Sequence, residues 1–123
     1  MVQQGDEGAE VVGDPHALKQ VFRNILENSL AACIDPVVIE VEHSLVDEGS
    51  DPWVVLSFRD NGPGFSPETR MKLFEPFFST KVKGTGLGMP IARRLVEAHG
   101  GVITVGVSNR PGAELLVELP KGR

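Results

Sequence analysis

Residues 53–64 read WVVLSFRDNGPG. Hydrophobic residues alternate along the first part of this stretch, which predicts a strand whose buried face carries Val54, Leu56 and Phe58. Asp60 ends that row, so we expect its carboxylate at the end of the strand. The four residues that follow it either form a plain turn, for which Asp-Asn-Gly is a strong signal, or let the backbone approach a bound ring closely. In the second case the Asp60 carboxylate could accept a hydrogen bond from the amino group that adenine carries at its six position, where guanine has a carbonyl.

A long helix is expected ahead of this strand. Asp14-Pro15 is a helix-start signal, an N-cap acceptor followed by a proline at the first helical position. The helix should run to about Ala32 or Cys33 and stop before Pro36. The apolar residues that recur at helical spacing along it are Leu18, Val21, Phe22, Ile25 and Leu26.

The other predicted elements complete one domain. We expect a short edge strand over residues 9–12, a strand over 37–42 and a short helix near 68–74. A second long helix should run from the glycines near residue 84 to His99, with an apolar stripe of Leu87, Ile91, Leu95 and Ala98. Gly100-Gly101 should end it as a C-terminal cap. Two strands, residues 102–107 and 113–119, follow, joined by a turn at residues 109–112. These elements predict an α+β fold with helices on one face of a mostly antiparallel sheet.

Asn24 and Asn28 are four residues apart, so they project from neighbouring positions on one face of the first helix. Amide oxygens are hard, neutral ligands. Magnesium typically takes one or two protein oxygens and fills its other positions with water and phosphate. The pair therefore indicates a magnesium site, or else two polar helix residues that hydrogen-bond to neighbours or water.

Residues 84–89 read GTGLGM and open the second long helix. Amides presented by glycine backbone at a helix N-terminus can bind phosphate. The stretch is not a P-loop, which requires Gly-Lys-Ser/Thr. It is not the dinucleotide fingerprint either, because Met89 occupies the third glycine position. A Gly-x-Gly-x-Gly motif is weak alone, and its place between a long loop and a helix strengthens it.

Phe74, Phe77 and Phe78 dominate the aromatic content, with Lys81 and Lys83 just beyond. The aromatic rings could dock a mobile lid that offers a lysine to phosphates. They could equally form a small satellite core under a long loop, with solvated lysines. The two interpretations are compatible.

The bulk composition excludes several classes of function. The chain has 123 residues and a net charge of -5, which argues against a broad electrostatic contact with nucleic acid or anionic lipid. Its single cysteine, Cys33, cannot form an internal disulfide, and there is no Cys/His metal-site spacing. No stretch is apolar enough to span a bilayer and no signal peptide is visible. Residues 1–8 are polar and contain glycine, so we expect a frayed tail or a cloning remnant there, followed by one domain over residues 9–123. That domain should be soluble and cytoplasmic, or the cytoplasmic part of a membrane-anchored sensor.

Taken in order, four short boxes make the chain resemble the catalytic ATP-binding domain of bacterial sensor histidine kinases, in the Bergerat-fold superfamily. They are the N box at residues 24–28, the G1 box at 60–64, the F box at 74–78 and the G2 box at 84–88. The closing Gly112-Ala113 also fits the usual ending of the family. The resemblance covers roughly Asp14 to Pro120, and residues 74–81 look most like the nitrogen-regulation type.

The resemblance implies a two-layer α/β sandwich, a mixed, mainly antiparallel sheet of about five strands packed on three helices. It implies ATP and Mg2+ as ligands. Asn28 would bind the metal with Asn24 supporting the site, and Asp60 would contact the adenine amino group. Lys81 would approach the terminal phosphates. The other residues that the resemblance implies at the nucleotide are Gly62, Gly64, Phe77, Thr80, Gly84, Thr85, Gly86, Leu87 and Gly88.

The implied reaction is transfer of the γ-phosphoryl group of ATP to a histidine on a separate dimerisation domain, with a response regulator downstream. None of His16, His43 and His99 has the acidic neighbour of a phospho-accepting histidine, so we expect no autophosphorylation by this chain alone. Relatives that hydrolyse ATP (gyrase, mismatch-repair and heat-shock chaperone types) carry a glutamate base at the position of Asn24. An amide cannot take a proton from water, which disfavours an ATPase. A nucleotide-binding regulatory module, such as an anti-sigma serine kinase, is the alternative.

Overall fold

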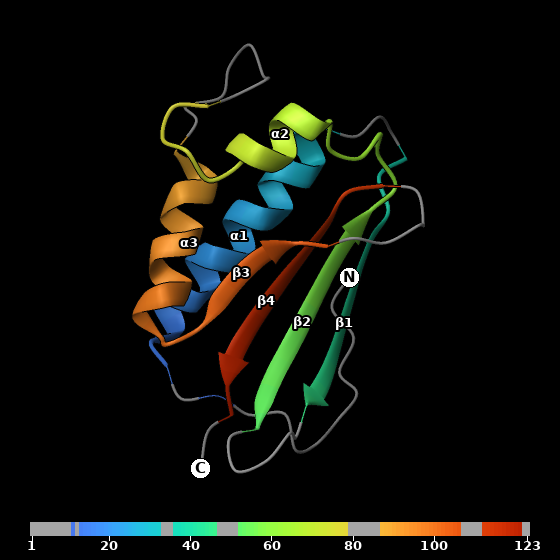
Figure 1. Ribbon diagram of the computed structural model, residues 1–123. Helices are drawn as coiled ribbons and strands as arrows, with labels where there is room; N and C mark the ends of the chain where they lie inside the picture. Colours follow the sequence, from blue (N-terminus) through green and yellow to red (C-terminus); the bar gives the residue numbers. More distant parts are fainter. Residues whose placement is uncertain are drawn as a thin grey trace.

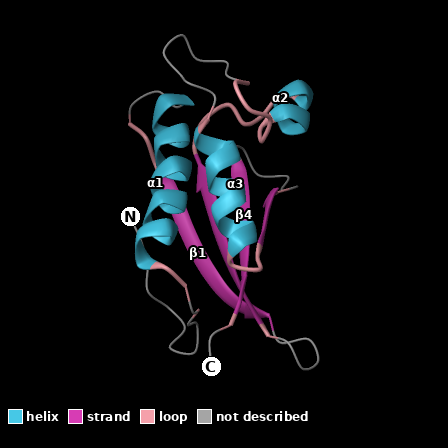
Figure 2. Cartoon of the chain, turned by 90° about the vertical axis from the view of Figure 1, so that its left-hand side faces the viewer, coloured by secondary structure: helices cyan, strands magenta, loops and turns pink. Residues whose placement is uncertain are grey.

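The computed structural model describes residues 11, 13–32, 36–46, 52–78, 87–106 and 112–121. In chain order the elements are α1 (Pro15–Ala32), β1 (Ile39–Val46), β2 (Trp53–Asp60), α2 (Pro67–Lys72), α3 (Gly88–Ala98), β3 (Val102–Val105) and β4 (Glu114–Pro120). Figures 1 and 2 show α1 and α3 packed side by side on one face of a single sheet. The α+β prediction and the placing of the helices on one face are confirmed.

The sheet has the order β1-β2-β4-β3, and all three neighbouring pairs are antiparallel. The expected mainly antiparallel sheet is therefore confirmed, and the described part of the chain holds four strands, where about five were expected, with no parallel pair among them. β1–β2 and β3–β4 follow each other directly, and β4 returns beside β2 in the opposite direction. The strand expected over residues 9–12 lies outside the described residues except for Val11, which packs against the core without belonging to a strand.

The core forms where α1 crosses the sheet. Val21 and Ile25 of α1 are completely buried, as their helical spacing predicts. The ring of Phe22 lies 5.7 Å from that of Phe58 on β2, measured between centroids. On β2 the predicted face carries the buried Val54 and Phe58 with the partly buried Leu56 between them, and the row ends at Asp60, which is only 5% exposed.

The apolar face of α3 differs from the prediction. The buried residues are Met89, Ala92 and Val96, whereas Ile91 is 41% exposed. The two sets have similar helical spacing, and the face that packs on α1 is the one that carries the small Ala92. Hydrophobic periodicity alone could not distinguish the two faces, because Leu95 lies at their border.

The end of α3 follows the prediction closely. Gly100 has a φ of +77°, and the amides of Gly100 and Gly101 donate to the carbonyls of Glu97 and Val96, respectively. This pair of bonds is the Schellman motif, which satisfies the last helical carbonyls. The observed ends of the other elements differ from the predicted ones by a few residues. In β1, for example, the strand runs to Val46, whereas it was expected to end at residue 42. None of the helices within the described ranges is long and apolar enough to cross a membrane.

His99 joins the two ends of the helical layer. Its Nδ1 lies 2.7 Å from the carbonyl oxygen of Leu95, and its Nε2 accepts a hydrogen bond of 3.0 Å from the backbone amide of Asp14. A carbonyl only accepts and an amide N–H only donates, so the ring is neutral with its proton on Nδ1. His99 is thus a structural residue, as predicted, and ties the end of α3 to the start of α1.

We expect His99→Ala to lower the free energy of unfolding by about 1–2 kcal/mol, because it removes two side-chain bonds to backbone groups. Urea denaturation followed by circular dichroism measures this loss. His16→Ala is the matched control, since the His16 side chain is exposed and the bond of this residue to Asp14 Oδ1 uses only its backbone amide. Equal losses in the two variants would contradict the tie.

Candidate functional site

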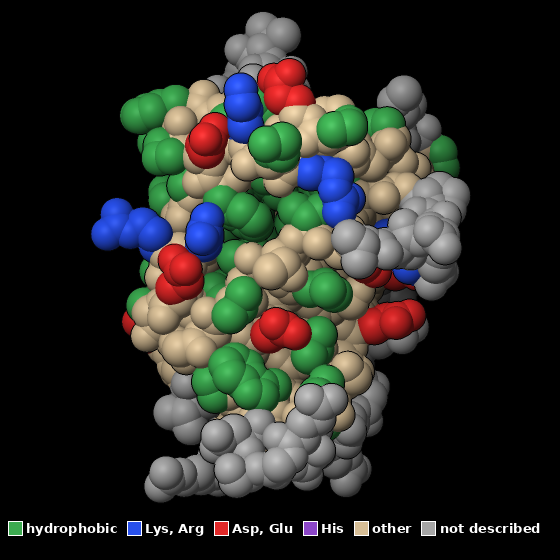
Figure 3. Space-filling model, viewed as in Figure 1, with side chains coloured by type: hydrophobic (Ala, Val, Ile, Leu, Met, Phe, Trp, Pro, Cys, Tyr) green, Lys and Arg blue, Asp and Glu red, His purple; other side chains and the backbone are tan. Residues whose placement is uncertain are grey.

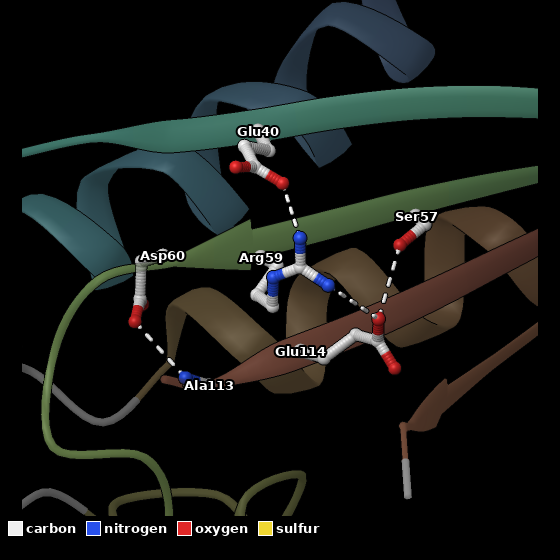
Figure 4. A network of polar contacts seen from close by, with 6 residues as sticks. All are labelled: Glu40, Ser57, Arg59, Asp60, Ala113 and Glu114. Atoms are coloured by element: carbon white, nitrogen blue, oxygen red, sulfur yellow. Dashed lines mark hydrogen bonds and ion pairs between the residues drawn. The ribbon is translucent and has the colours of Figure 1, made fainter. Parts of the chain in front are cut away.

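Asp60 is held in place by the strand beside it. Its Oδ1 accepts hydrogen bonds from the amides of Gly62, at 2.9 Å, and Ala113, at 3.0 Å. Its own amide donates to the Ala113 carbonyl at 3.0 Å. Figure 4 shows the carboxylate turned toward the start of β4. Within the described ranges, both bonds to the carboxylate end on Oδ1, and none ends on Oδ2. The turn predicted for residues 60–64 is therefore present, and the adenine contact of Asp60 stays a prediction.

Two glycines let the backbone close around Asp60. Gly112 has a φ of +99°, and a Cβ built there would lie 1.9 Å from the Asp60 carbonyl oxygen. Gly64 has a φ of +80°, and its Cβ would lie 3.3 Å from the carbonyl oxygen of Gly112. Gly62 and Gly64 are predicted site residues. Gly112-Ala113 was recognisable in the sequence only as a typical ending, and no local pattern indicated its contact with Asp60.

On the face of the sheet turned away from α1 and α3, a polar network links the three strands next to Asp60. Arg59 makes ion pairs with Glu40 on β1 and with Glu114 on β4, the second at 3.9 Å, and Ser57 also hydrogen-bonds to Glu114 (Figure 4). The Arg59 side chain is only 10% exposed. Figure 3 shows this side of the molecule, where acidic and hydrophobic side chains are mixed. Three strands are thus tied together directly beside Asp60.

Asn61 ties the end of β2 to the segment before β1. Its Oδ1 accepts from the amide of Val38 at 3.1 Å, and its Nδ2 donates to the carbonyl of Pro36 at 2.9 Å. From the sequence, Asn61 was predicted only as part of a turn. The Asn61 side chain therefore anchors the end of β2 to the segment that leads into β1.

The two asparagines of α1 differ in their surroundings. Asn24 is 8% exposed; its Nδ2 donates to the Gly88 carbonyl at 2.9 Å, and its Oδ1 accepts from Gln20 Nε2 at 2.8 Å. Asn28 lies one turn further along and is half-buried. Figure 1 places the C-terminal end of α1, the end of β2, α2 and the first turn of α3 at the same end of the molecule. The structure therefore gathers at one end the N box, the start of the G1 box and the end of the G2 box, beside α2, which precedes the F box.

Two phenylalanines of the F box, Phe74 and Phe77, have different surroundings, and the lid proposed for this segment stays a prediction. Phe74 packs against the core, and the Arg93 guanidinium lies 5.5 Å from the centre of its ring. Phe77 is 76% exposed and has a φ of +66°, which is strained for a residue with a side chain. Phe74 therefore belongs to the core, while Phe77 is presented to solvent.

Part of the predicted site lies outside the described residues. This concerns Thr80, Lys81, Gly84, Thr85 and Gly86, and also Cys33. Leu87 immediately precedes α3 and its carbonyl accepts from the amide of Ile91 at 3.0 Å. Gly88 is the first residue of the helix, as its place in the glycine box predicted.

Residues 13–123 match the protein family described as histidine kinase-, DNA gyrase B-, and HSP90-like ATPase. The chain belongs to this family. The match spans α1 to β4 and thus includes all four boxes, so the domain is an ATP-binding domain. The resemblance inferred from the boxes is confirmed at the level of the family, while the nitrogen-regulation subtype stays a prediction.

Curated relatives of this domain are kinases. The chain is 34% identical to sporulation kinase C of Bacillus subtilis, covering 93% of this chain and 26% of the relative. It is 38% identical to the sensor histidine kinase ZraS of Klebsiella oxytoca, covering 89% of this chain and 23% of the relative. The chain therefore spans about a quarter of the length of these relatives.

Solved structures of histidine kinases share the fold. The mycobacterial sensor histidine kinase MprB matches with a TM-score of 0.78 and 28% identity over 90% of this chain and 76% of that one. Full-length ShkA in complex with AMPPNP matches with a TM-score of 0.77 and 32% identity over 93% of this chain and 23% of that one. The domain is therefore of the histidine-kinase type within its family.

Proposed function

We propose that this domain binds ATP with Mg2+ and donates the γ-phosphoryl group to a histidine on a separate dimerisation domain of its parent kinase. The observation that carries the proposal is the buried Asp60, whose Oδ1 is held by two backbone amides while Oδ2 has no bond within the described residues. A carboxylate fixed in this way suits the six-amino group of adenine. The similar ShkA structure, a complex with AMPPNP, supports a nucleotide at this kind of domain.

The metal would be held from α1. The amide oxygen of Asn28 is the kind of hard, neutral donor that magnesium accepts, and the rest of its shell would come from phosphate and water. When bound, the ion would neutralise phosphate charge. Phe77 and Gly64 would border the nucleotide. The residues that we propose to contact the phosphates are Thr80, Lys81, Gly84, Thr85, Gly86, Leu87 and Gly88.

The chemistry of the site favours transfer over hydrolysis. The Asn24 amide has no basic atom, and both of its ends are bonded to protein groups. Water at the phosphates would therefore find no general base at this position. The acceptor histidine and the downstream response regulator would lie on other domains or proteins, and a domain that uses ATP would lie in the cytoplasm. The relatives named above are kinases, so the alternative of an anti-sigma module is not favoured.

Calorimetric titration tests the proposal directly. The ligands are ADP and AMPPNP, with and without Mg2+, and GTP serves as the control. We expect binding that is selective for adenine and strengthened by the metal. An intact fold that binds neither adenine nucleotide would refute the proposal.

We expect Asn28→Ala to lose the magnesium dependence of AMPPNP binding, because the protein's oxygen ligand is removed. The measurement is the ratio of dissociation constants with and without Mg2+. Glu27→Ala is the control, since Glu27 is an exposed neighbour that pairs with Arg23. If Asn28→Ala keeps the full metal-coupled affinity, Asn28 is not the ligand.

A further inference from the structure

We infer that Asn24 is a positioning residue: its side-chain amide holds the first residue of α3 against α1 and so sets the spacing of the two helices at the nucleotide-binding end. The Asn24 side chain is nearly buried, and it bonds to Gly88, which is 64 residues away in the sequence. α1 and α3 pack directly on each other, and Figure 2 shows them running alongside one another. The inference rests on the proposed function where it concerns nucleotide affinity.

The bond pattern requires an amide at this position. The carbonyl oxygen of Gly88 can only accept, so the atom 2.9 Å away must be a donor. Gln20 Nε2 donates to the other end of the same amide at 2.8 Å and so fixes its orientation. A carboxylate of the same shape would place an acceptor against the Gly88 carbonyl. It would still accept from Gln20, so only the bond to α3 would fail.

The first turn of α3 depends on this tertiary bond. Leu87 occupies the N-cap position of α3 and makes no side-chain capping bond. Asparagine, aspartate, serine or threonine would normally cap such a helix from within. Asn24 instead holds the helix start from α1, one turn before Asn28. Its side chain would thus support the metal site through α3 and without contacting the metal.

Hydrogen exchange in the nucleotide-free domain tests the tether. In Asn24→Asp at neutral pH we expect the amides in the first two turns of α3, including Ile91, to exchange about ten-fold faster, the usual worth of one net hydrogen bond. The amides of β2 and β4 should change much less. As the pH is lowered toward about 5, the introduced carboxyl becomes protonated, can donate to Gly88, and protection should return relative to the wild type at the same pH.

Asn24→Ala is the second variant, and it tests the tether even if Asn24→Asp does not fold, because it adds no buried charge. It should show the same local loss of protection without the pH-dependent recovery. In parallel, AMPPNP affinity should fall several-fold in both variants and recover at low pH only in Asn24→Asp.

The possible outcomes separate the tether from the proposed function. Unchanged exchange in α3 would overturn the inference, and so would a loss of nucleotide affinity with exchange unchanged, which would make Asn24 a direct ligand. Faster exchange in α3 with unaltered affinity would overturn the positioning role. If the wild type binds no nucleotide, the proposed function fails, while the exchange and its pH dependence still decide whether Asn24 holds α3.

Discussion

Gly112→Ala will destabilise the domain by about 3 kcal/mol or more, because it combines backbone strain with a clash between backbone and side chain. The φ of +99° at Gly112 is a conformation that only glycine adopts readily. The new Cβ would lie 1.9 Å from the Asp60 carbonyl oxygen, so the start of β4 must move away from the end of β2. That movement also breaks the bond between the Ala113 amide and the Asp60 carboxylate.

Thermal and urea unfolding measure the loss of stability. Gly88→Ala is the matched control for stability, because a Cβ there meets nothing closer than the Asn24 Cγ at 4.0 Å and Gly88 starts a helix. It should be neutral or slightly stabilising, since alanine is the better helix former. If the Gly112→Ala domain is as stable as Gly88→Ala, the close approach of Gly112 to the Asp60 carbonyl is not present in the protein.

Asp60→Asn should leave the fold intact and weaken AMPPNP binding by about 1–3 kcal/mol, or roughly 5- to 150-fold in Kd. The asparagine oxygen can still accept from the amides of Gly62 and Ala113, so the local structure is preserved. Its NH2 group takes the place of Oδ2, and it would face the amino group of adenine with a second donor. The same NH2 could donate to the six-carbonyl of guanine. The ratio of the dissociation constants for GTP and AMPPNP should therefore decrease.

Calorimetry with AMPPNP and GTP on both proteins measures the two effects. Asp14→Asn makes the same chemical change at the exposed N-cap of α1, where Oδ1 accepts from the amide of His16, and it should leave nucleotide affinity unchanged. Unaltered adenine affinity in Asp60→Asn would remove Asp60 from the adenine site. Loss of affinity accompanied by unfolding would instead assign it a structural role.

Much of the fold could be predicted because its signals are local. The start of α1 at Pro15, the alternation along β2 and the glycine cap after α3 each depend on a few neighbouring residues. The face of α3 could not be predicted, since two overlapping stripes were both apolar and only packing on α1 distinguished them. Strand directions were also hard to predict, because strand pairing depends on residues far apart in the sequence. A mixed sheet was expected, and all pairs within the described residues are antiparallel.

The sequence by itself determined the family of the chain and the residue types at the site. Four ordered boxes and the positions of their amides, carboxylate and glycines are properties of the primary structure. Only the tertiary structure decided what each side chain contacts. Asp60 meets Ala113 across 53 residues, Asn24 meets Gly88 across 64 and His99 meets Asp14 across 85. Such contacts arise when the sheet and the helical layer pack together, and short-range patterns carry no information about partners so far away along the chain.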